Sequence, residues 1–125
     1  MLEHIVYVDD EEDIREVALI ALEDIGGFTV KAFGSGPALL KALPPAPDLV
    51  LLDVMMPVMD GPALLRELRR QPGYDKTPAI FMTAKVQPSE VQALLAEGAI
   101  GVVAKPFDPV QLAAEIRRLW EKAKA

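Results

Sequence analysis

Short runs of apolar residues alternate along the chain with stretches in which apolar residues recur at every third or fourth position. We predict the apolar runs as strands, at His4–Val8, Phe28–Phe33, Leu49–Leu52, Pro78–Met82 and Ile100–Ala104. The intervening stretches have the spacing of amphipathic helices. Five strand-then-helix units predict the α/β fold class: a doubly wound, five-stranded parallel sheet with right-handed crossovers and helices on both faces.

The predicted helices begin at residues that commonly cap helices. They run from about Glu12 to Ile25, from Pro37 to Leu43, from Asp60 to the polar loop at Gln71, from Pro88 to Gly98, and from Pro109 toward the C-terminus. Ser35, Asp60 and Asp108 are the predicted N-caps, because their side chains can accept hydrogen bonds from the first free backbone amides.

The helical spacing also predicts which side chains face the core. In the first helix these are Ile14, Val17, Ala18, Ala21, Leu22 and Ile25; in the third, Leu64, Leu65 and Leu68; in the last, Leu112, Ile116 and Leu119. Arg66, Arg69 and Arg70 are expected to face solvent. Trp120 is expected at the rim of the core or in an interface.

The stretch from Asp48 to Gly61 contains the most informative pattern. Leu49–Leu52 is continuously apolar, which is typical of a strand buried on both faces. The run ends at Asp53, and an unpaired charge inside the strand would cost several kcal/mol. Asp53 is therefore expected at the carboxyl end of the strand, where open α/β sheets bind ligands. Taken alone, Asp53 is better explained as the start of a turn.

Other polar side chains follow the neighbouring strands. Asp9 and Asp10 follow the first predicted strand, Thr83 ends the fourth and Lys105 follows the fifth. Since parallel strands end at one edge, all are expected to converge there with Asp53. By contrast, Glu12 and Asp13 need no more than the favourable dipole at a helix start to explain them. A lone Thr or Lys at a strand end is also commonly structural.

The expected constellation combines three carboxylates with one ammonium group. Its excess negative charge is suited to a hard divalent cation with oxygen ligands, and Mg²⁺ fits best, with Mn²⁺ as an alternative. Such an ion would neutralise a phosphoryl group, which Lys105 and the Thr83 hydroxyl would also contact. Asp53 is the natural nucleophile, because carboxylates form aspartyl phosphates.

Composition narrows the range of functions. The net charge of −6 argues against direct nucleic-acid binding, which needs a basic surface. There is no cysteine, no signal-peptide pattern and no apolar run long enough to span a membrane, so we expect a cytoplasmic protein without a membrane partner. Residues 1–125 are expected to form a single domain without an output domain.

The motifs at the strand ends resemble those of the receiver domain of two-component response regulators. The matching stretches are Val8-Asp9-Asp10, Leu51-Leu52-Asp53-Val54-Met55-Met56-Pro57, Asp60-Gly61, Met82-Thr83-Ala84 and Gly101-Val102-Val103-Ala104-Lys105-Pro106-Phe107. The resemblance covers the whole chain. It implies a flavodoxin-like fold with strand order 2-1-3-4-5.

The resemblance also implies roles for individual residues. Asp53 would accept a phosphoryl group, from a histidine kinase or a histidine phosphotransfer protein. The metal ligands would be Asp9, Asp10, Asp53 and the backbone carbonyl of Met55. Thr83, Ala84 and Lys105 would contact the phosphoryl group and relay its presence, and Pro106 would follow a cis peptide bond. The domain would catalyse only its own phosphorylation and dephosphorylation, and would not be an enzyme in its own right.

One departure and two tuning positions qualify this expectation. The family often has an aromatic switch residue where this chain has Val102, so an aromatic rotamer change cannot relay the signal. Met55 and Lys85 occupy positions that set the lifetime of the phosphoryl group. The downstream partner is expected on the fourth helix, fifth strand and fifth helix, a surface that also serves for homodimers formed on phosphorylation.

The sequence bears on three other functions. A receiver-like interaction module that never needs phosphate remains the main alternative, and Val102 gives it some weight. An aspartyl phosphatase would need a second Asp two residues after the nucleophile, where this chain has Met55. A dinucleotide-binding domain is excluded, because no Gly-x-Gly-x-x-Gly motif follows the first strand.

Overall fold

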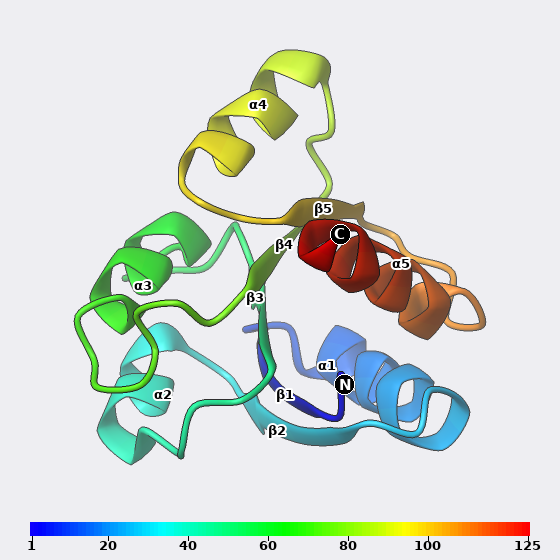
Figure 1. The fold of residues 1–125 in the computed structure, drawn as a ribbon, viewed down its shortest axis with the longest axis horizontal. Helices are drawn as coiled ribbons and strands as arrows, with labels where there is room; N and C mark the ends of the chain where they lie inside the picture. Colours follow the sequence, from blue (N-terminus) through cyan, green and yellow to red (C-terminus); the bar gives the residue numbers. More distant parts are fainter.

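Five parallel strands form one sheet at the centre of the computed structural model, which describes residues 1–125. The strands are β1 (His4–Val8), β2 (Thr29–Phe33), β3 (Leu49–Asp53), β4 (Ala79–Thr83) and β5 (Gly101–Ala104). Their order is β2-β1-β3-β4-β5, which confirms the predicted fold class and strand order (Figure 1). The predicted start of the second strand at Phe28 is one residue early.

Helices cover both faces of the sheet. They are α1 (Glu12–Leu19), its continuation η1 (Ile20–Ile25), α2 (Gly36–Ala42), α3 (Gly61–Leu68), α4 (Pro88–Ala96) and α5 (Leu112–Lys124). Figure 1 shows α1 and α5 on one face and α2 and α3 on the other, with α4 beside β5. None of these helices is both long and apolar enough to cross a bilayer.

The sheet separates two layers of core. On β1, Ile5 and Tyr7 belong to the layer under α1 and α5, whereas Val6 and Val8 belong to the layer under α2 and α3. This division follows from the alternation of side chains along a strand. The central strands β3 and β4 are buried along their whole length, as the continuous apolar runs predict.

The first helix differs from its predicted face. Ala18, Ala21 and Leu22 are buried, but Val17 is 43% exposed and Ile25 is 52% exposed, so the prediction was wrong for these two residues. The final turn is wound as a π-helix, with the backbone amide of Gly26 bonded to the carbonyl of Ala21. The wider turn rotates Ile25 away from the sheet. Val17 borders the cleft at the carboxyl edge of the sheet.

The predicted caps of α2 and α3 are confirmed. The Ser35 hydroxyl accepts a hydrogen bond from the Ala38 amide at 3.1 Å, and the Asp60 carboxylate accepts one from the Ala63 amide at 2.9 Å. Asp108 also caps a turn, but regular α5 geometry begins at Leu112 instead of Pro109. The residues in between form a tighter turn, in which the Asp108 carbonyl accepts a hydrogen bond from the Gln111 amide at 3.0 Å.

Two other side chains depart from their expected positions. Arg69 does not face solvent freely: its guanidinium donates to the carbonyls of Tyr74 and Thr77 and fixes the loop after α3. Trp120 is only 6% exposed and packs into the core layer under α1 and α5. The Lys124 ammonium group covers its ring at 4.1 Å from the centroid.

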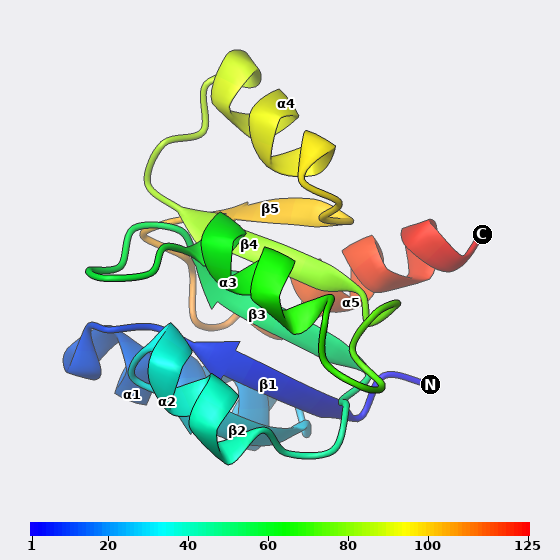
Figure 2. The same ribbon diagram turned by 90° about the vertical axis from the view of Figure 1, so that its left-hand side faces the viewer.

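The register of the strands brings the carboxyl ends of β1, β3, β4 and β5 to one edge of the sheet. Val8 pairs with Leu52, Asp53 with Met82, and Thr83 with Ala104. The residues that follow β1 and β5 therefore meet the last residues of β3 and β4. In Figure 2 the arrowheads of β1 and β3 point to this common edge, which carries the candidate site.

Candidate functional site

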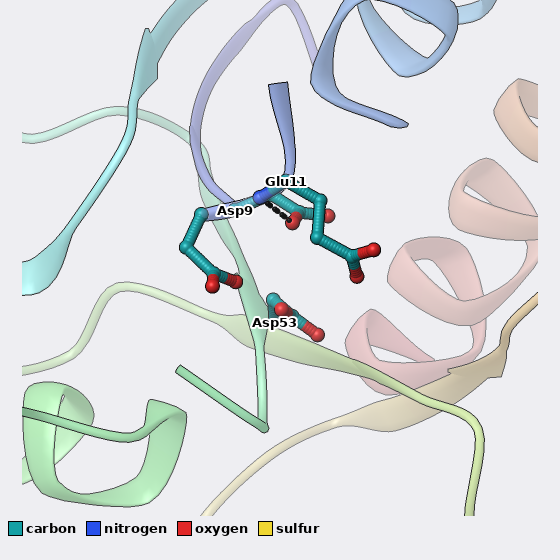
Figure 3. Close-up of side chains that lie close together, drawn as sticks. Asp9, Glu11 and Asp53 are labelled. Carbon is teal, nitrogen blue, oxygen red and sulfur yellow. Dashed lines mark hydrogen bonds between the residues drawn. The ribbon is translucent and has the colours of Figure 1, made fainter. Parts of the chain in front are cut away.

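Four carboxylates gather where β1 and β3 end. Asp9, Asp10 and Glu11 follow β1, and each can place a carboxylate oxygen within 4.8 Å of the others and of Asp53. Figure 3 shows Asp9, Glu11 and Asp53 close together in this cluster. Asp9 and Asp53 are buried, with 0% and 3% exposure, whereas Asp10 and Glu11 are exposed.

Lys105 connects three of these carboxylates. Its Nζ atom lies 3.1 Å from Oδ2 of Asp9, 3.1 Å from Oδ1 of Asp53 and 3.4 Å from Oε1 of Glu11. Burial by itself would lower the pKa of Lys105, but the contacts with the two aspartates raise it. Lys105 is therefore charged, and it offsets one of the four negative charges.

Asp9 accepts hydrogen bonds at both carboxylate oxygens and at its backbone carbonyl. Its Oδ1 atom accepts from the Glu11 amide at 3.0 Å, and its Oδ2 atom accepts from the Tyr7 hydroxyl at 2.9 Å as well as from Lys105. The Arg15 guanidinium binds the Asp9 backbone carbonyl at 2.7 Å. These contacts fix one orientation of a buried carboxylate, whose burial would otherwise be costly.

Asp53 has a perturbed acidity. Burial, and then the negative charge of Asp9, raise the pKa of the Asp53 carboxyl from its ordinary value to about 6, although Lys105 acts in the opposite direction. The carboxylate is consequently the main form at neutral pH. Asp53 and the neighbouring carboxylates repel one another, and a further cation bound in the site would reduce this repulsion.

Thr83 and Ala84 lie beside this cluster at the end of β4. Thr83 is buried, and its hydroxyl accepts a hydrogen bond from the Lys85 amide at 3.0 Å, but it makes no hydrogen bond to Asp53 or Lys105. Backbone pairing does join the two strand ends, because the Lys105 amide donates to the Thr83 carbonyl at 2.9 Å. Ala84 is exposed and adds no bulk to the entrance.

A cleft of about 520 Å³ opens above Asp53. The side chains that line it are Glu11, Asp13, Ile14, Val17, Asp53, Met55, Ala84, Lys105, Pro106 and Phe107. The peptide bond between Lys105 and Pro106 is cis. The cleft thus has a charged floor and an apolar rim, with Met55 63% exposed at its edge.

The donor set fits a hard cation. Carboxylate oxygens from β1 and β3 converge without any nitrogen or sulfur ligand, as Mg²⁺ requires. Asp10 makes no hydrogen bond or ion pair and is available as a ligand, in contrast to the fully bonded Asp9. The Met55 carbonyl also accepts no backbone hydrogen bond.

Sequence reasoning missed two contributors to the site. The sequence predicts no role for Glu11, and it predicts Tyr7 only as part of the strand His4–Val8. The alternation of side chains offered a signal for Tyr7, because residues two apart on a strand share a face and Tyr7 precedes Asp9 by two. No local pattern distinguishes Glu11 from Glu12, which lacks a contact with Lys105.

Comparisons with known proteins agree on one family. Residues 5–117 match the family model described as the response regulator receiver domain. The transcriptional regulatory protein CseB of Streptomyces avermitilis is 39% identical over 120 residues, which are 95% of this chain and 49% of that protein. The DNA-binding response regulator MtrA of Mycobacterium tuberculosis is 37% identical over 94% of this chain and 50% of its own length. The chain spans about half the length of the curated relatives it matches.

The solved structures similar to this chain include response regulators and receiver domains. The chemotaxis response regulator CheY4 of Vibrio cholerae has a TM-score of 0.84 at 33% identity, covering 95% of this chain and 99% of that one. The BeF3-activated DrrB receiver domain has a TM-score of 0.81 at 30% identity, covering 97% of this chain and 99% of its own.

Proposed function

The chain belongs to the response regulator receiver domain family, whose function is phosphoryl acceptance, and we propose that Asp53 is its phosphoacceptor. The observation that carries this assignment is the position of the buried Asp53 carboxylate, at the end of β3 and 3.1 Å from the Lys105 ammonium group. A buried carboxylate beside a cation and further acids is arranged for chemistry more than for stability.

The proposed reaction transfers a phosphoryl group from a phosphohistidine to Asp53. A carboxylate oxygen of Asp53 attacks the phosphorus atom as the phosphorus–nitrogen bond breaks. The electron pair of that bond stays on the histidine ring, which takes up a proton, and Asp53 becomes an acyl phosphate. Hydrolysis of the acyl phosphate returns the carboxylate and inorganic phosphate, so the domain acts as a switch.

Receiver domains bind Mg²⁺ at an acidic pocket, and this chain has a suitable group of acids. We assign the ligands as Asp10, Asp53 and the Met55 carbonyl, with Asp9 as the further acid that completes the site; Mn²⁺ would be accepted by the same oxygens. When bound, the ion supplies positive charge opposite the phosphoryl oxygens. The charge of a bound divalent ion would balance the excess of carboxylates over cations in the site.

Lys105, Thr83 and Ala84 are proposed to contact the phosphoryl group. Lys105 already lies 3.1 Å from Oδ1 of Asp53, and the Thr83 hydroxyl is one strand away at the same edge. Ala84 leaves space for the donor to approach. With Val102 at the position of the usual aromatic switch, the relay from Thr83 would depend on backbone movement at the ends of β4 and β5.

The partners of the chain follow from the same site. A histidine kinase or a histidine phosphotransfer protein would cover the cleft, and the apolar rim at Val17, Met55 and Phe107 would contact it. The downstream protein, or a second copy after phosphorylation, would bind the surface of α4, β5 and α5. The reaction uses donors found in the cytoplasm, which is the expected location.

A phosphate-independent interaction module is the second candidate, and Val102 is the observation that favours it. The two candidates predict different results in one experiment. Intact mass is measured after incubation with acetyl phosphate and Mg²⁺, with EDTA in place of Mg²⁺, and with the Asp53→Asn variant. A gain of one phosphoryl group only in the first sample is expected. No gain in any sample would favour the interaction module, and labelling of Asp53→Asn would refute Asp53 as acceptor.

A further inference from the structure

Two donors share a single oxygen of Asp9. The Tyr7 hydroxyl lies 2.9 Å from Oδ2, and Lys105 Nζ lies 3.1 Å from the same atom. Tyr7 and Asp9 are both fully buried, with 0% exposure. Tyr7 is a neutral donor, whereas Lys105 is a charged donor that also contacts Oδ1 of Asp53.

The two donors differ in their freedom to move. Tyr7 lies in the middle of β1, between Ala32 of β2 and Leu51 of β3, and its ring is part of the core layer under α1 and α5. Lys105 follows β5, and its flexible side chain reaches into a cleft that is open to solvent. Only Lys105 can turn toward a new anion without repacking the core.

Phosphorylation would make that difference important. A phosphoryl group on Asp53 offers Lys105 a more highly charged partner than Asp9 does. If Lys105 turns to it, Asp9 Oδ2 loses its charged donor while remaining buried. A buried carboxylate oxygen left without any donor carries the full cost of its desolvation.

We propose that Tyr7 is a positioning residue, whose hydroxyl keeps Asp9 hydrogen-bonded and in place when Lys105 turns to the phosphoryl group on Asp53. This inference rests on the proposed function. Tyr7 contacts neither the acceptor nor the incoming group, so it acts through Asp9. Its role predicts an effect that depends on the state of the site, which a purely structural tyrosine would not show.

The test compares Tyr7→Phe with Tyr74→Phe. Each variant removes one hydroxyl from a buried ring, and Tyr74 is the matched control because its hydroxyl donates to the Pro44 carbonyl away from the site. The probe is beryllium fluoride with Mg²⁺, which mimics a phosphoryl group on Asp53, and its dissociation constant is measured by calorimetry. Tyr7→Phe is expected to bind about tenfold more weakly than wild type, as the loss of one hydrogen bond to a charged group implies. Tyr74→Phe is expected to bind as wild type does.

The outcomes distinguish a failure of the proposed role of Tyr7 from a failure of the proposed phosphoryl acceptance. Failure of the wild type to bind beryllium fluoride would refute the proposed function and this inference with it. Equal binding by wild type and Tyr7→Phe would refute only the role of Tyr7. A loss of folding stability in Tyr7→Phe with unchanged affinity would assign Tyr7 a structural role, and would likewise overturn the proposal.

A second measurement leaves Tyr7 unchanged and uses a variant only to assign the signals. Wild-type protein labelled at the tyrosine Cζ carbons gives two signals, since the chain has two tyrosines, and Tyr74→Phe assigns them. The Tyr7 signal is expected to keep the shift of a phenol bonded to a carboxylate throughout the beryllium fluoride titration. A change to the shift of a phenol without an acceptor would show that Tyr7 releases Asp9, contrary to the proposal.

Discussion

The ammonium group of Lys105 lies 3.1 Å from Oδ1 of Asp53, across a junction of strands that are 52 residues apart in sequence. The same nitrogen binds Asp9 at 3.1 Å. Lys105 thus occupies a position between the proposed phosphoacceptor and a carboxylate of the proposed metal site. A phosphoryl group on Asp53 or a metal ion among these acids would therefore bind next to this one side chain.

Asp53 is expected to reduce the stability of the metal-free protein. Because burial and Asp9 raise the pKa of Asp53 to about 6 from its ordinary value of 3.8, the folded state binds more protons than the unfolded state between these values. Stability therefore falls as pH rises through this window. In EDTA, Asp53→Asn should be more stable than wild type near neutral pH, by on the order of 2 kcal/mol.

Denaturant unfolding in EDTA checks this prediction at two pH values. The advantage of Asp53→Asn should be full at about pH 7 and should shrink as the pH falls from about 6 through 3.8, the ordinary pKa, below which the acid is mostly protonated in both states. An advantage that does not change with pH would contradict the charge-based explanation. Asp60→Asn, at the exposed cap of α3, serves as the control for loss of one negative charge.

Lys105→Ala is expected to retain some phosphoryl acceptance but to lose the response. The substitution removes the cation between Asp9 and Asp53, while the other acids and the metal ligands remain. Backbone amide spectra report the response at α4 and β5, and the change caused by beryllium fluoride should be much smaller than in wild type. Lys76→Ala, at an exposed position in the loop after α3, should respond normally. A normal response by Lys105→Ala would show that Lys105 relays nothing.

Val58 carries backbone strain next to the site. It has φ of 70° although it is β-branched, and its side chain is 96% exposed. A left-handed conformation costs a non-glycine residue about 1–2 kcal/mol, and this side chain gains no burial in return. Relief of this strain is partly offset by the greater unfolded-state entropy of glycine, so Val58→Gly is expected to stabilise the fold by about 1 kcal/mol in denaturant unfolding. Val110→Gly, at an exposed valine without positive φ, should give no stabilisation; an equal gain there would refute the strain argument.

Gly61 is expected to be required for the geometry of Asp53. A Cβ atom at this position would lie 2.6 Å from the Asp53 carbonyl oxygen and 3.1 Å from the Val54 Cα atom. Both are backbone atoms that cannot rotate away. Gly61→Ala should therefore cost about 1–3 kcal/mol of stability and slow phosphorylation by acetyl phosphate, measured by intact mass. Wild-type stability and rate in this variant would show that the loop after β3 adjusts freely.

Much of the fold was determined by local sequence. The continuous apolar run before Asp53 predicts a buried strand, and Ser35 and Asp60 predict helix starts, because each signal acts within a few residues. The strand-then-helix order then restricts the sheet to parallel strands. From this alone, Asp9, Asp10, Asp53, Thr83 and Lys105 could be placed at one edge of the sheet.

Contacts between elements were decided by the tertiary structure. The exposure of Val17 and Ile25 and the inward turn of Arg69 depend on how helices and loops meet, and no periodicity encodes that. The contact of Glu11 with Lys105 and the sharing of one Asp9 oxygen by Tyr7 and Lys105 are likewise properties of the assembled sheet. The sequence determined which groups reach the site, since burial forces charges to strand ends; only packing in three dimensions determined which oxygen each donor binds, because hydrogen bonds depend on distances between atoms that are remote in the chain.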